Sequence, residues 1–156
     1  GSASTASHMS CDLSKNTLTR AYDNNEKRFR VMSLTDNIAL MTAFANDLSY
    51  ADIFIQQLRN LIDRNDVLIA MSGSGNSVNI VKAVKYAKSR KAKTIGLLGF
   101  KNGGKVAKLV DCPIIIQSNK YGPIEDVHLI LSHIMSALLA KAKKQHDHIN
   151  HTRQKK

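Results

Sequence analysis

The sequence predicts an α/β domain in which a parallel sheet is flanked by helices on both faces. Apolar runs of strand length alternate with segments of helical periodicity through most of the chain. This order is typical of parallel strands joined by crossover helices. The length of 156 residues, with 43% hydrophobic and 22% charged residues, fits one globular domain and excludes low complexity or disorder for most of the chain.

The first part of the chain is predicted to be mainly helical. Small helix-compatible residues open it, a polar connection follows over residues 14–28, and a run with β-branched and aromatic residues then has the composition of a strand. The predicted elements are a helix over Ala3–Leu13, a strand over Phe29–Leu34, a helix capped by Thr35 or Asp36 and ending at Asn46-Asp47, and a helix over Tyr50–Asp63 with Ile53, Phe54, Leu58, Leu61 and Ile62 facing inward.

The clearest unit follows. Val67–Met71 is a continuous apolar run, as expected for a strand buried on both faces. A loop of serines and glycines, Ser72–Ser77, comes next and leads into helical periodicity over Val78–Lys88. The remaining predicted elements are a strand over Thr94–Leu98, a short helix opened by Gly103-Gly104 and reaching Val110, a strand over Pro113–Ile116, and a long helix from Ile124 to about Lys144.

The formal net charge of +11 suggests nucleic acid first, but the distribution of the charge disfavours that partner. The excess lies in two blocks, Lys82–Lys108 and Lys141–Lys156, and the first has the spacing of a solvated helix face. The chain has no Trp and 5% aromatic residues, so stacking platforms for RNA or single strands are scarce. The polar tail at 145–156, with three histidines, is expected to be disordered, with adventitious metal binding as the alternative.

The two cysteines, Cys11 and Cys112, provide no disulfide framework and no short metal-binding spacing. No apolar run approaches the roughly 18 residues of a membrane span, and no signal peptide opens the sequence. We therefore expect a cytoplasmic protein with no membrane partner.

The serine loop has the composition of an anion site. In a parallel sheet, ligands bind where strands end and loops enter helices. Gly73 and Gly75 allow backbone N–H groups to turn inward, and the serine hydroxyls of Ser72, Ser74 and Ser77 add donors beside a helix N-terminus. A phosphate is the expected ligand, although neither the P-loop pattern nor the dinucleotide pattern is present. The alternative is a polar turn that only caps the helix.

The loop, with its strand and helix, resembles the phosphosugar-binding loop of SIS (sugar isomerase) domains. Within that family the chain is most similar to the sedoheptulose-7-phosphate isomerases, which are also called phosphoheptose isomerases. The resemblance extends to about Lys144. The further stretches that carry it are Gly1–His8, with His8 at the position of a metal-binding His; Ala45-Asn46-Asp47; Gly103-Gly104-Lys105; and Ile124-Glu125-Asp126-Val127-His128 with His133.

The resemblance implies a flavodoxin-like sandwich that isomerises sedoheptulose 7-phosphate to D-glycero-D-manno-heptose 7-phosphate for surface polysaccharide. It implies a homotetramer with active sites between subunits, and a chain that begins inside a native loop, so that residues 1–144 form one SIS domain without the family's N-terminal helices and first strand. The implied substrate-binding residues are Ser72, Gly73, Ser74 and Ser77 for the phosphate and Ser2, Asn46, Asp47 and Glu125 for the sugar.

The resemblance also implies one divalent metal, zinc, per subunit, bound by His8, Asp12, Glu125 and His133, with Asp12 as the base and His133 as the acid. On a helix, His8 and Asp12 leave the same face, whereas Glu125 and His133 lie about 12 Å apart along the axis. Spacing alone does not establish a joint site, because such a His is more often packed or exposed.

Four positions depart from the family pattern. Asp12 stands where the family has Glu, Glu125 where it has Gln, and Gly122-Pro123 where it has Asp-Arg. A shorter base and a lost charge are expected to affect catalysis and sugar preference. They leave open an alternative function, a non-catalytic SIS module that senses phosphosugars or binds a protein. His128 is expected to be packed rather than catalytic.

Overall fold

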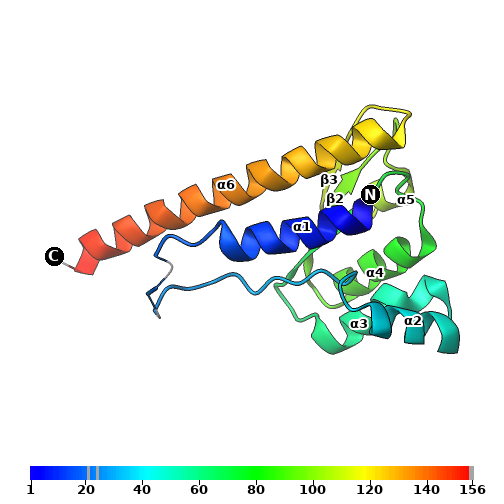
Figure 1. Cartoon of the computed structure of the whole chain (residues 1–156), viewed down its shortest axis with the longest axis horizontal. Helices are drawn as coiled ribbons and strands as arrows, with labels where there is room; N and C mark the ends of the chain where they lie inside the picture. The colour runs from blue at the N-terminus through cyan, green and yellow to red at the C-terminus, as the bar shows by residue number, and fades with distance from the viewer. Residues whose placement is uncertain (21, 24, 155–156) are drawn as a thin grey trace.

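A computed structural model of the chain describes residues 1–20, 22–23 and 25–154, with side chains described as far as His146. At its centre are three parallel strands, β1 (Val67–Ser72), β2 (Lys93–Leu98) and β3 (Cys112–Ile115), in the order β1-β2-β3 (Figure 1). Met71 pairs with Leu97, and Leu97 with Ile114. The predicted parallel α/β architecture is confirmed.

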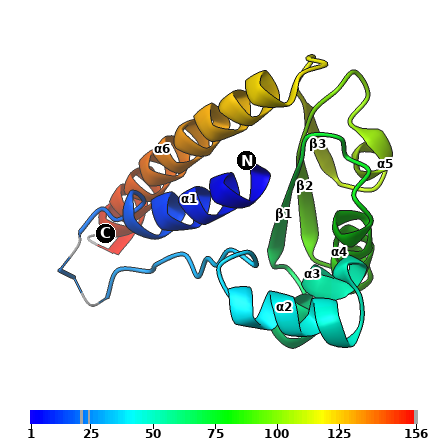
Figure 2. The same cartoon turned by 45° about the vertical axis from the view of Figure 1, so that its right-hand side comes forward.

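Helices cover both faces of the sheet (Figure 2). The crossover helices α4 (Val78–Ser89) and α5 (Gly104–Ala107) pack on one face, where Ala70, Val84, Leu98 and Val106 form a buried cluster. On the other face lie α1 (Ser2–Lys15) and α6 (Tyr121–Gln154); their cluster of buried residues is Met9, Leu13, Met71 and Leu97. Successive strand residues therefore point to opposite faces, as the pleat of a strand requires.

Two further helices are α2 (Ile38–Asp47) and α3 (Ile53–Leu61), joined by the 3-10 turn Tyr50–Asp52. Helix α3 packs on α4, and α2 packs on α3. The cap of α2 is Asn37, whose side chain accepts a hydrogen bond from the Leu40 N–H at 2.9 Å, so the prediction of Thr35 or Asp36 is wrong. Leu61, expected to face inward, is 44% exposed because α3 ends there.

The predicted strand over Phe29–Leu34 is wrong: the segment belongs to no sheet in the described structure. The prediction of a strand buried on both faces is confirmed at the carboxyl end of β1, where Ala70 belongs to the buried cluster on one face and Met71 to the cluster on the other, and is wrong at Val67. In the described structure β1 is an edge strand, paired with β2 alone, and Val67 is 56% exposed. The composition of Phe29–Leu34 suits a strand, but a strand also needs a partner for its backbone groups, which sequence periodicity does not supply.

Helices α1 and α6 run parallel, side by side in both views (Figures 1 and 2). Three contacts show a nearly constant offset along the chain. Gly1 lies beside Glu125, His8 beside His133, and the Thr17 carbonyl accepts a hydrogen bond from Lys143 Nζ at 2.9 Å. Side chains that are far apart in sequence therefore meet in register along this seam.

The far end of the seam is held by Glu26. Its carboxylate accepts hydrogen bonds from Lys143 Nζ (2.8 Å), from the Thr19 N–H (2.8 Å) and from the Arg20 N–H (2.9 Å). The ammonium of Lys143, followed by the Thr19 N–H, lowers the pKa of Glu26 to about 2. This carboxylate therefore attaches the segment between α1 and α2 to α6.

Helix α6 is longer than predicted and continues to Gln154, where a disordered tail was expected. No Gly or Pro follows Pro123, so nothing in the sequence stops the helix. Within its Tyr121–His146 part, an 18-residue window has a mean hydropathy of 1.2, so this helix is long and apolar enough to cross a membrane, although no unbroken apolar run of that length is present. One such helix is weak evidence for a membrane protein, since long core helices of globular proteins have the same composition.

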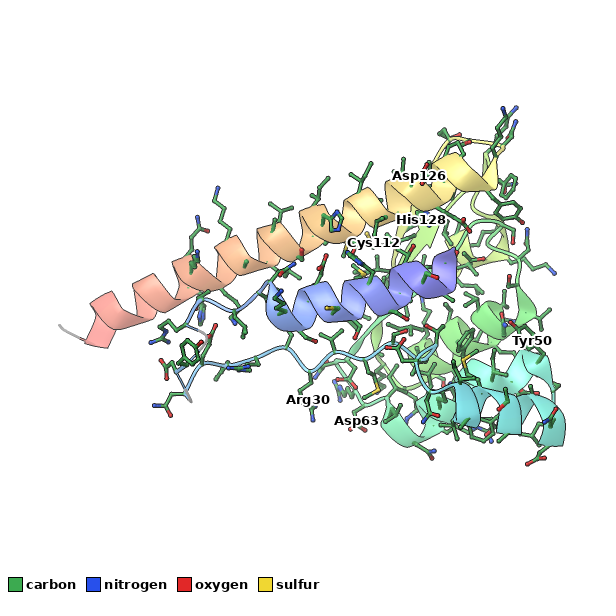
Figure 3. All side chains as sticks on the ribbon, viewed as in Figure 1. Arg30, Tyr50, Asp63, Cys112, Asp126 and His128 are labelled. Carbon is green, nitrogen blue, oxygen red and sulfur yellow. The ribbon has the colours of Figure 1, made fainter. Side chains whose placement is uncertain are left out.

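We predict that Glu26→Gln lowers the melting temperature at pH 7 and weakens its dependence on pH. A carboxylate whose pKa is depressed from 4.5 to about 2 stabilises the fold above pH 4.5, and the stabilisation is lost as the pH falls toward 2. Thermal unfolding followed by circular dichroism between pH 7 and pH 2 measures both effects. Asp126→Asn, at an exposed position of α6, is the matched control (Figure 3).

Candidate functional site

Three predicted metal ligands meet on the seam between α1 and α6. His8 and Asp12 leave the same face of α1, and His133 reaches them from α6. The two imidazole Nε2 atoms lie 2.8 Å apart. Asp12 Oδ2 lies 3.3 Å from His8 Nε2 and 3.6 Å from His133 Nε2. Ligand atoms bound to one tetrahedral zinc at about 2.0–2.2 Å would be separated by similar distances, so these residues fit one ion.

The Asp12 carboxylate is the centre of this group. It is 8% exposed, and one oxygen, Oδ1, accepts a hydrogen bond from the Asn16 side chain at 2.9 Å. The other oxygen, Oδ2, is buried and has no hydrogen-bond partner among the described residues. A buried carboxylate oxygen without a donor is costly unless a cation or proton occupies the site. The arrangement therefore suits a divalent ion held by two imidazoles and one carboxylate.

The serine loop lies at the carboxyl end of β1, as predicted. Ser72 is buried, and its Oγ accepts a hydrogen bond from the Gly75 N–H at 3.1 Å. Ser74 Oγ accepts one from the Asn76 N–H at 3.2 Å. Ser77 is the N-cap of α4, and its side chain makes no capping hydrogen bond. The Ser77 hydroxyl therefore remains available to an anion at the positive end of a 12-residue helix.

The Gly103-Gly104 turn supports the serine loop from behind. Gly75 (φ +60°) and Gly104 (φ +61°) both have left-handed backbone conformations. A Cβ on Gly75 would clash with the backbone of Gly103, and a Cβ on Gly104 would clash with the backbone of Ser74. The Val106 N–H donates to the Gly75 carbonyl at 2.9 Å, and the Lys105 N–H donates to Asn76 Oδ1 at 3.1 Å. The two loops thus form one backbone unit, which explains why both are rich in glycine.

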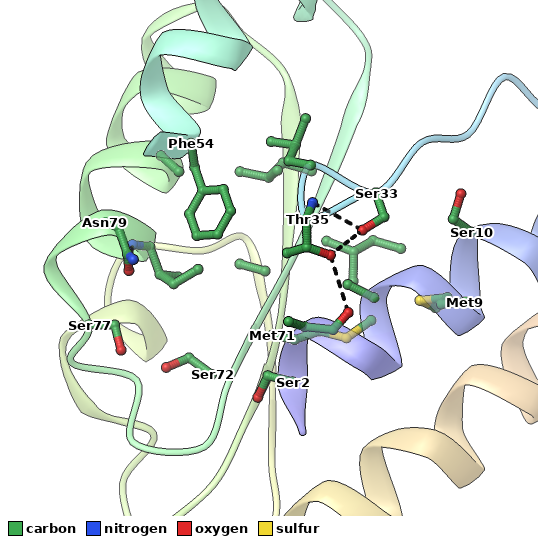
Figure 4. A pocket seen from close by; sticks show the side chains of 18 of the residues that line it. Ser2, Met9, Ser10, Ser33, Thr35, Phe54, Met71, Ser72, Ser77 and Asn79 are labelled. Atoms are coloured by element: carbon green, nitrogen blue, oxygen red, sulfur yellow. Dashed lines mark hydrogen bonds between the residues drawn. The ribbon is translucent and has the colours of Figure 1, made fainter. Parts of the chain in front are cut away.

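A cavity of ≈ 370 Å³ lies between α1, β1 and the segment before α2 (Figure 4). Ser2, Ser72, Gly73, Ser74 and Ser77 line it, and Ser2 lies close to Ser72 in the close view. The rest of its wall is largely apolar. Its polar end is therefore the serine loop together with the first residues of α1.

Comparison with known proteins agrees with this geometry. Residues 8–99 match the SIS domain family. The chain belongs to this family. A phosphoheptose isomerase of Helicobacter pylori (strain ATCC 700392 / 26695) is 38% identical over 135 residues, which cover 86% of this chain and 67% of the relative.

Other members extend the similarity of this SIS domain. A phosphoheptose isomerase of a Nitratiruptor species is 33% identical over 139 residues, covering 89% of this chain and 71% of the relative. The solved structure of a phosphoheptose isomerase from Neisseria gonorrhoeae superimposes with a TM-score of 0.79 at 28% identity, covering 89% of this chain and 71% of that one.

Glu125 lies outside the His8-Asp12-His133 group. Its carboxylate lies 3.6 Å from the Gly1 backbone nitrogen, at the start of α1. The parallel packing of the two helices explains this position: Glu125 precedes His133 by eight residues, so it meets the α1 residue seven positions before His8. The structure therefore brings three of the four predicted ligands together and places Glu125 beside Gly1.

Asn46 and Asp47 lie at the exposed end of α2 and do not line the cavity in the described structure. His128 is fully buried, with Nε2 3.1 Å from the Leu98 carbonyl oxygen, so its predicted packing role is confirmed. Burial lowers the pKa of His128 and favours its neutral form.

Two residues of the site were missed by sequence reasoning. Asn16 orients Asp12, and Asn76 joins the serine loop to the next turn. The first has a usable signal, because Asn16 follows Asp12 by four residues and so shares its helix face. Asn76 gives no such signal, since its partner, the Lys105 N–H, is 29 residues away.

We predict that the chain binds one zinc ion and that His8→Ala or His133→Ala weakens binding more than about 100-fold, because each removes a ligand. Asn16→Ala should weaken binding by about 10–100-fold, the usual effect of removing a group that orients a ligand. Isothermal titration with zinc measures these affinities, and His146→Ala near the far end of α6 is the control. Unchanged affinity in both histidine variants would contradict the assignment.

We also predict that Gly75→Ala destabilises the domain by about 1–3 kcal/mol and abolishes phosphate binding, because Gly75 has φ +60° and abuts Gly103. Gly122→Ala is the matched control, since a Cβ there has no neighbour within 4 Å. Urea unfolding and phosphate titration distinguish the two variants. If Gly75→Ala and Gly122→Ala were equally stable, the close approach of the serine loop to the Gly103-Gly104 turn would not require glycine at position 75.

Proposed function

We propose that this SIS domain isomerises a phosphorylated sugar between its ketose and aldose forms, with sedoheptulose 7-phosphate as substrate and D-glycero-D-manno-heptose 7-phosphate as product. The observation that carries the proposal is the buried Asp12 carboxylate, whose free oxygen faces two imidazoles. The similarity to proteins named phosphoheptose isomerase gives the substrate class.

The phosphate is expected to bind at the serine loop. Ser72, Ser74 and Ser77 present hydroxyls there, and the first N–H groups of α4 add the positive end of the helix dipole. Gly73 lets the backbone come close to the anion. This end of the site fixes the phosphate and so sets where the carbonyl end of the sugar lies.

The proton transfer is assigned to Asp12 and His133. Conversion of a ketose to an aldose needs a base that moves a proton between C1 and C2 and an acid that serves the neighbouring oxygens. Asp12 supplies the base and His133 the acid, while Asn16 holds the carboxylate in place. A divalent metal, zinc, held by His8, Asp12 and His133, would polarise the sugar oxygens and stabilise developing negative charge.

The remaining predicted residues are assigned to the sugar. Glu125, on α6 beside Gly1, is proposed to accept a hydrogen bond from a sugar hydroxyl. Ser2 lies beside the loop. Asn46 and Asp47 are proposed to contact the substrate within a homotetramer, whose active sites lie between subunits. We propose a cytoplasmic location and a role in heptose synthesis for surface polysaccharide.

The test is an isomerase assay on sedoheptulose 7-phosphate with zinc-loaded protein. We expect turnover in the wild type and a loss of about 10²–10⁴-fold in kcat for Asp12→Asn, because the variant loses the base and the anionic metal ligand together. Phosphate affinity should be retained, because the serine loop is unchanged. Asp126→Asn is the exposed carboxylate control. Metal and phosphosugar binding without turnover on any heptose, hexose or pentose phosphate would instead support a sensing module.

A further inference from the structure

Tyr121, the first residue of α6, joins the parts of the site that meet at the carboxyl ends of the strands. Among the described residues it is the one member of α6 that lines the cavity, together with Ser72, Ser74 and Ser77. It is 56% exposed, so its ring does not serve the hydrophobic core. A large aromatic side chain on the surface beside a ligand loop calls for a functional explanation.

The Tyr121 ring lies directly against the backbone of Gly73. A Cβ on Gly73 would be 2.8 Å from Tyr121 Cδ1 and 2.9 Å from Cε1, closer than real Cβ contacts. Gly73 is not among the residues with positive φ, unlike Gly75, so its backbone conformation is open to alanine. The ring of Tyr121 is therefore the main reason that glycine is needed at this position of the loop.

A second aromatic residue holds the ring. Phe100 meets Tyr121 edge to face, with ring centroids 5.0 Å apart and an interplanar angle of 84°. Phe100 has φ +49°, a left-handed conformation that is costly for a residue other than glycine. Strained backbones of this kind cluster at ligand sites, where the surrounding structure maintains them. Both the strain and the ring pair lie where β2 ends.

Gly122 and Ile124, the neighbours of Tyr121 in the first turn of α6, do not line the cavity beside the serine loop in the described structure. Gly122 has no side chain, and a Cβ there would meet no atom within 4 Å. Ile124 is fully buried and packs on Gly99, which follows β2. The start of α6 therefore presents an aromatic ring, and no charge, to the serine loop.

We propose that Tyr121 is a positioning and specificity residue for the phosphate-bearing end of the substrate. Its ring, held by Phe100, presses on Gly73 and keeps the serine loop in the shape that binds the phosphate of a sugar phosphate. This inference rests on the proposed function, since it takes the serine loop as the phosphate subsite. The part of Tyr121 that acts is the ring rather than the hydroxyl, because the contact with Gly73 is made by ring carbons.

The first test compares Tyr121→Ala with Tyr121→Phe. We expect Tyr121→Ala to weaken binding of inorganic phosphate and of sedoheptulose 7-phosphate about tenfold, the worth of one aromatic contact, and to raise KM with kcat little changed. Tyr121→Phe should stay within about twofold of the wild type, because it keeps the ring. Tyr22→Ala, at a fully exposed tyrosine, is the control. Melting temperatures show that each variant is folded.

The second test is a double-mutant cycle with Gly73→Ala. The added Cβ should displace the ring and weaken phosphate binding, whereas Gly73→Ala combined with Tyr121→Ala should bind no more weakly than Tyr121→Ala alone. Additive losses, or wild-type affinity in Tyr121→Ala, would overturn the inference. A wild-type protein that binds neither phosphate nor sedoheptulose 7-phosphate would instead overturn the proposed function itself, so the two failures are distinguishable.

Discussion

The parallel packing of α1 on α6 is the contact on which the rest of the molecule depends. Met9 and Leu13 of α1 pack with Leu131 and Met135 of α6 against the sheet, and this apolar layer fixes the register of the two helices. Because both helices run in the same direction, the register that joins Gly1 to Glu125 also brings His8 to His133. A shift of one turn, about 5.4 Å, would move the His133 imidazole away from His8 and Asp12, which share α1. The geometry of the polar group is thus set by hydrophobic side chains that touch no ligand.

A second unit, made of backbone rather than side chains, forms the other end of the site. The serine loop and the Gly103-Gly104 turn approach so closely that glycine is required on both sides. Hydrogen bonds from the Val106 and Lys105 N–H groups then tie the loops together. The serine loop, the proposed phosphate subsite, is held in place by the neighbouring turn, so its hydroxyls would need little reorganisation to bind an anion.

Much of this organisation could be predicted from the sequence, and the failures have physical causes. The strand, serine loop and helix of Val67–Lys88 were predictable because apolar run, turn chemistry and helical period agree there. Asp12 and His8 were predictable as a pair because helix spacing is local. Glu125 was assigned to the metal on resemblance, yet its distance from His133 along α6 follows from the helix rise alone. Phe29–Leu34 was assigned to a strand on composition, but a strand exists only where another strand accepts its hydrogen bonds. Tyr121 could not be found from sequence, since its contact with Gly73 spans 48 residues of chain.

The outer edge of β1 has a consequence beyond the geometry of the sheet. Five of its six residues are apolar, and the edge carries no proline and no lysine, the devices by which exposed edges are usually protected from other chains. An extended polypeptide laid along this edge would meet unpaired backbone amide and carbonyl groups and the apolar side chains of β1. The same strand that ends in the serine loop is therefore also an edge of the described sheet at which a foreign peptide or another copy of the chain could add a strand by β-augmentation.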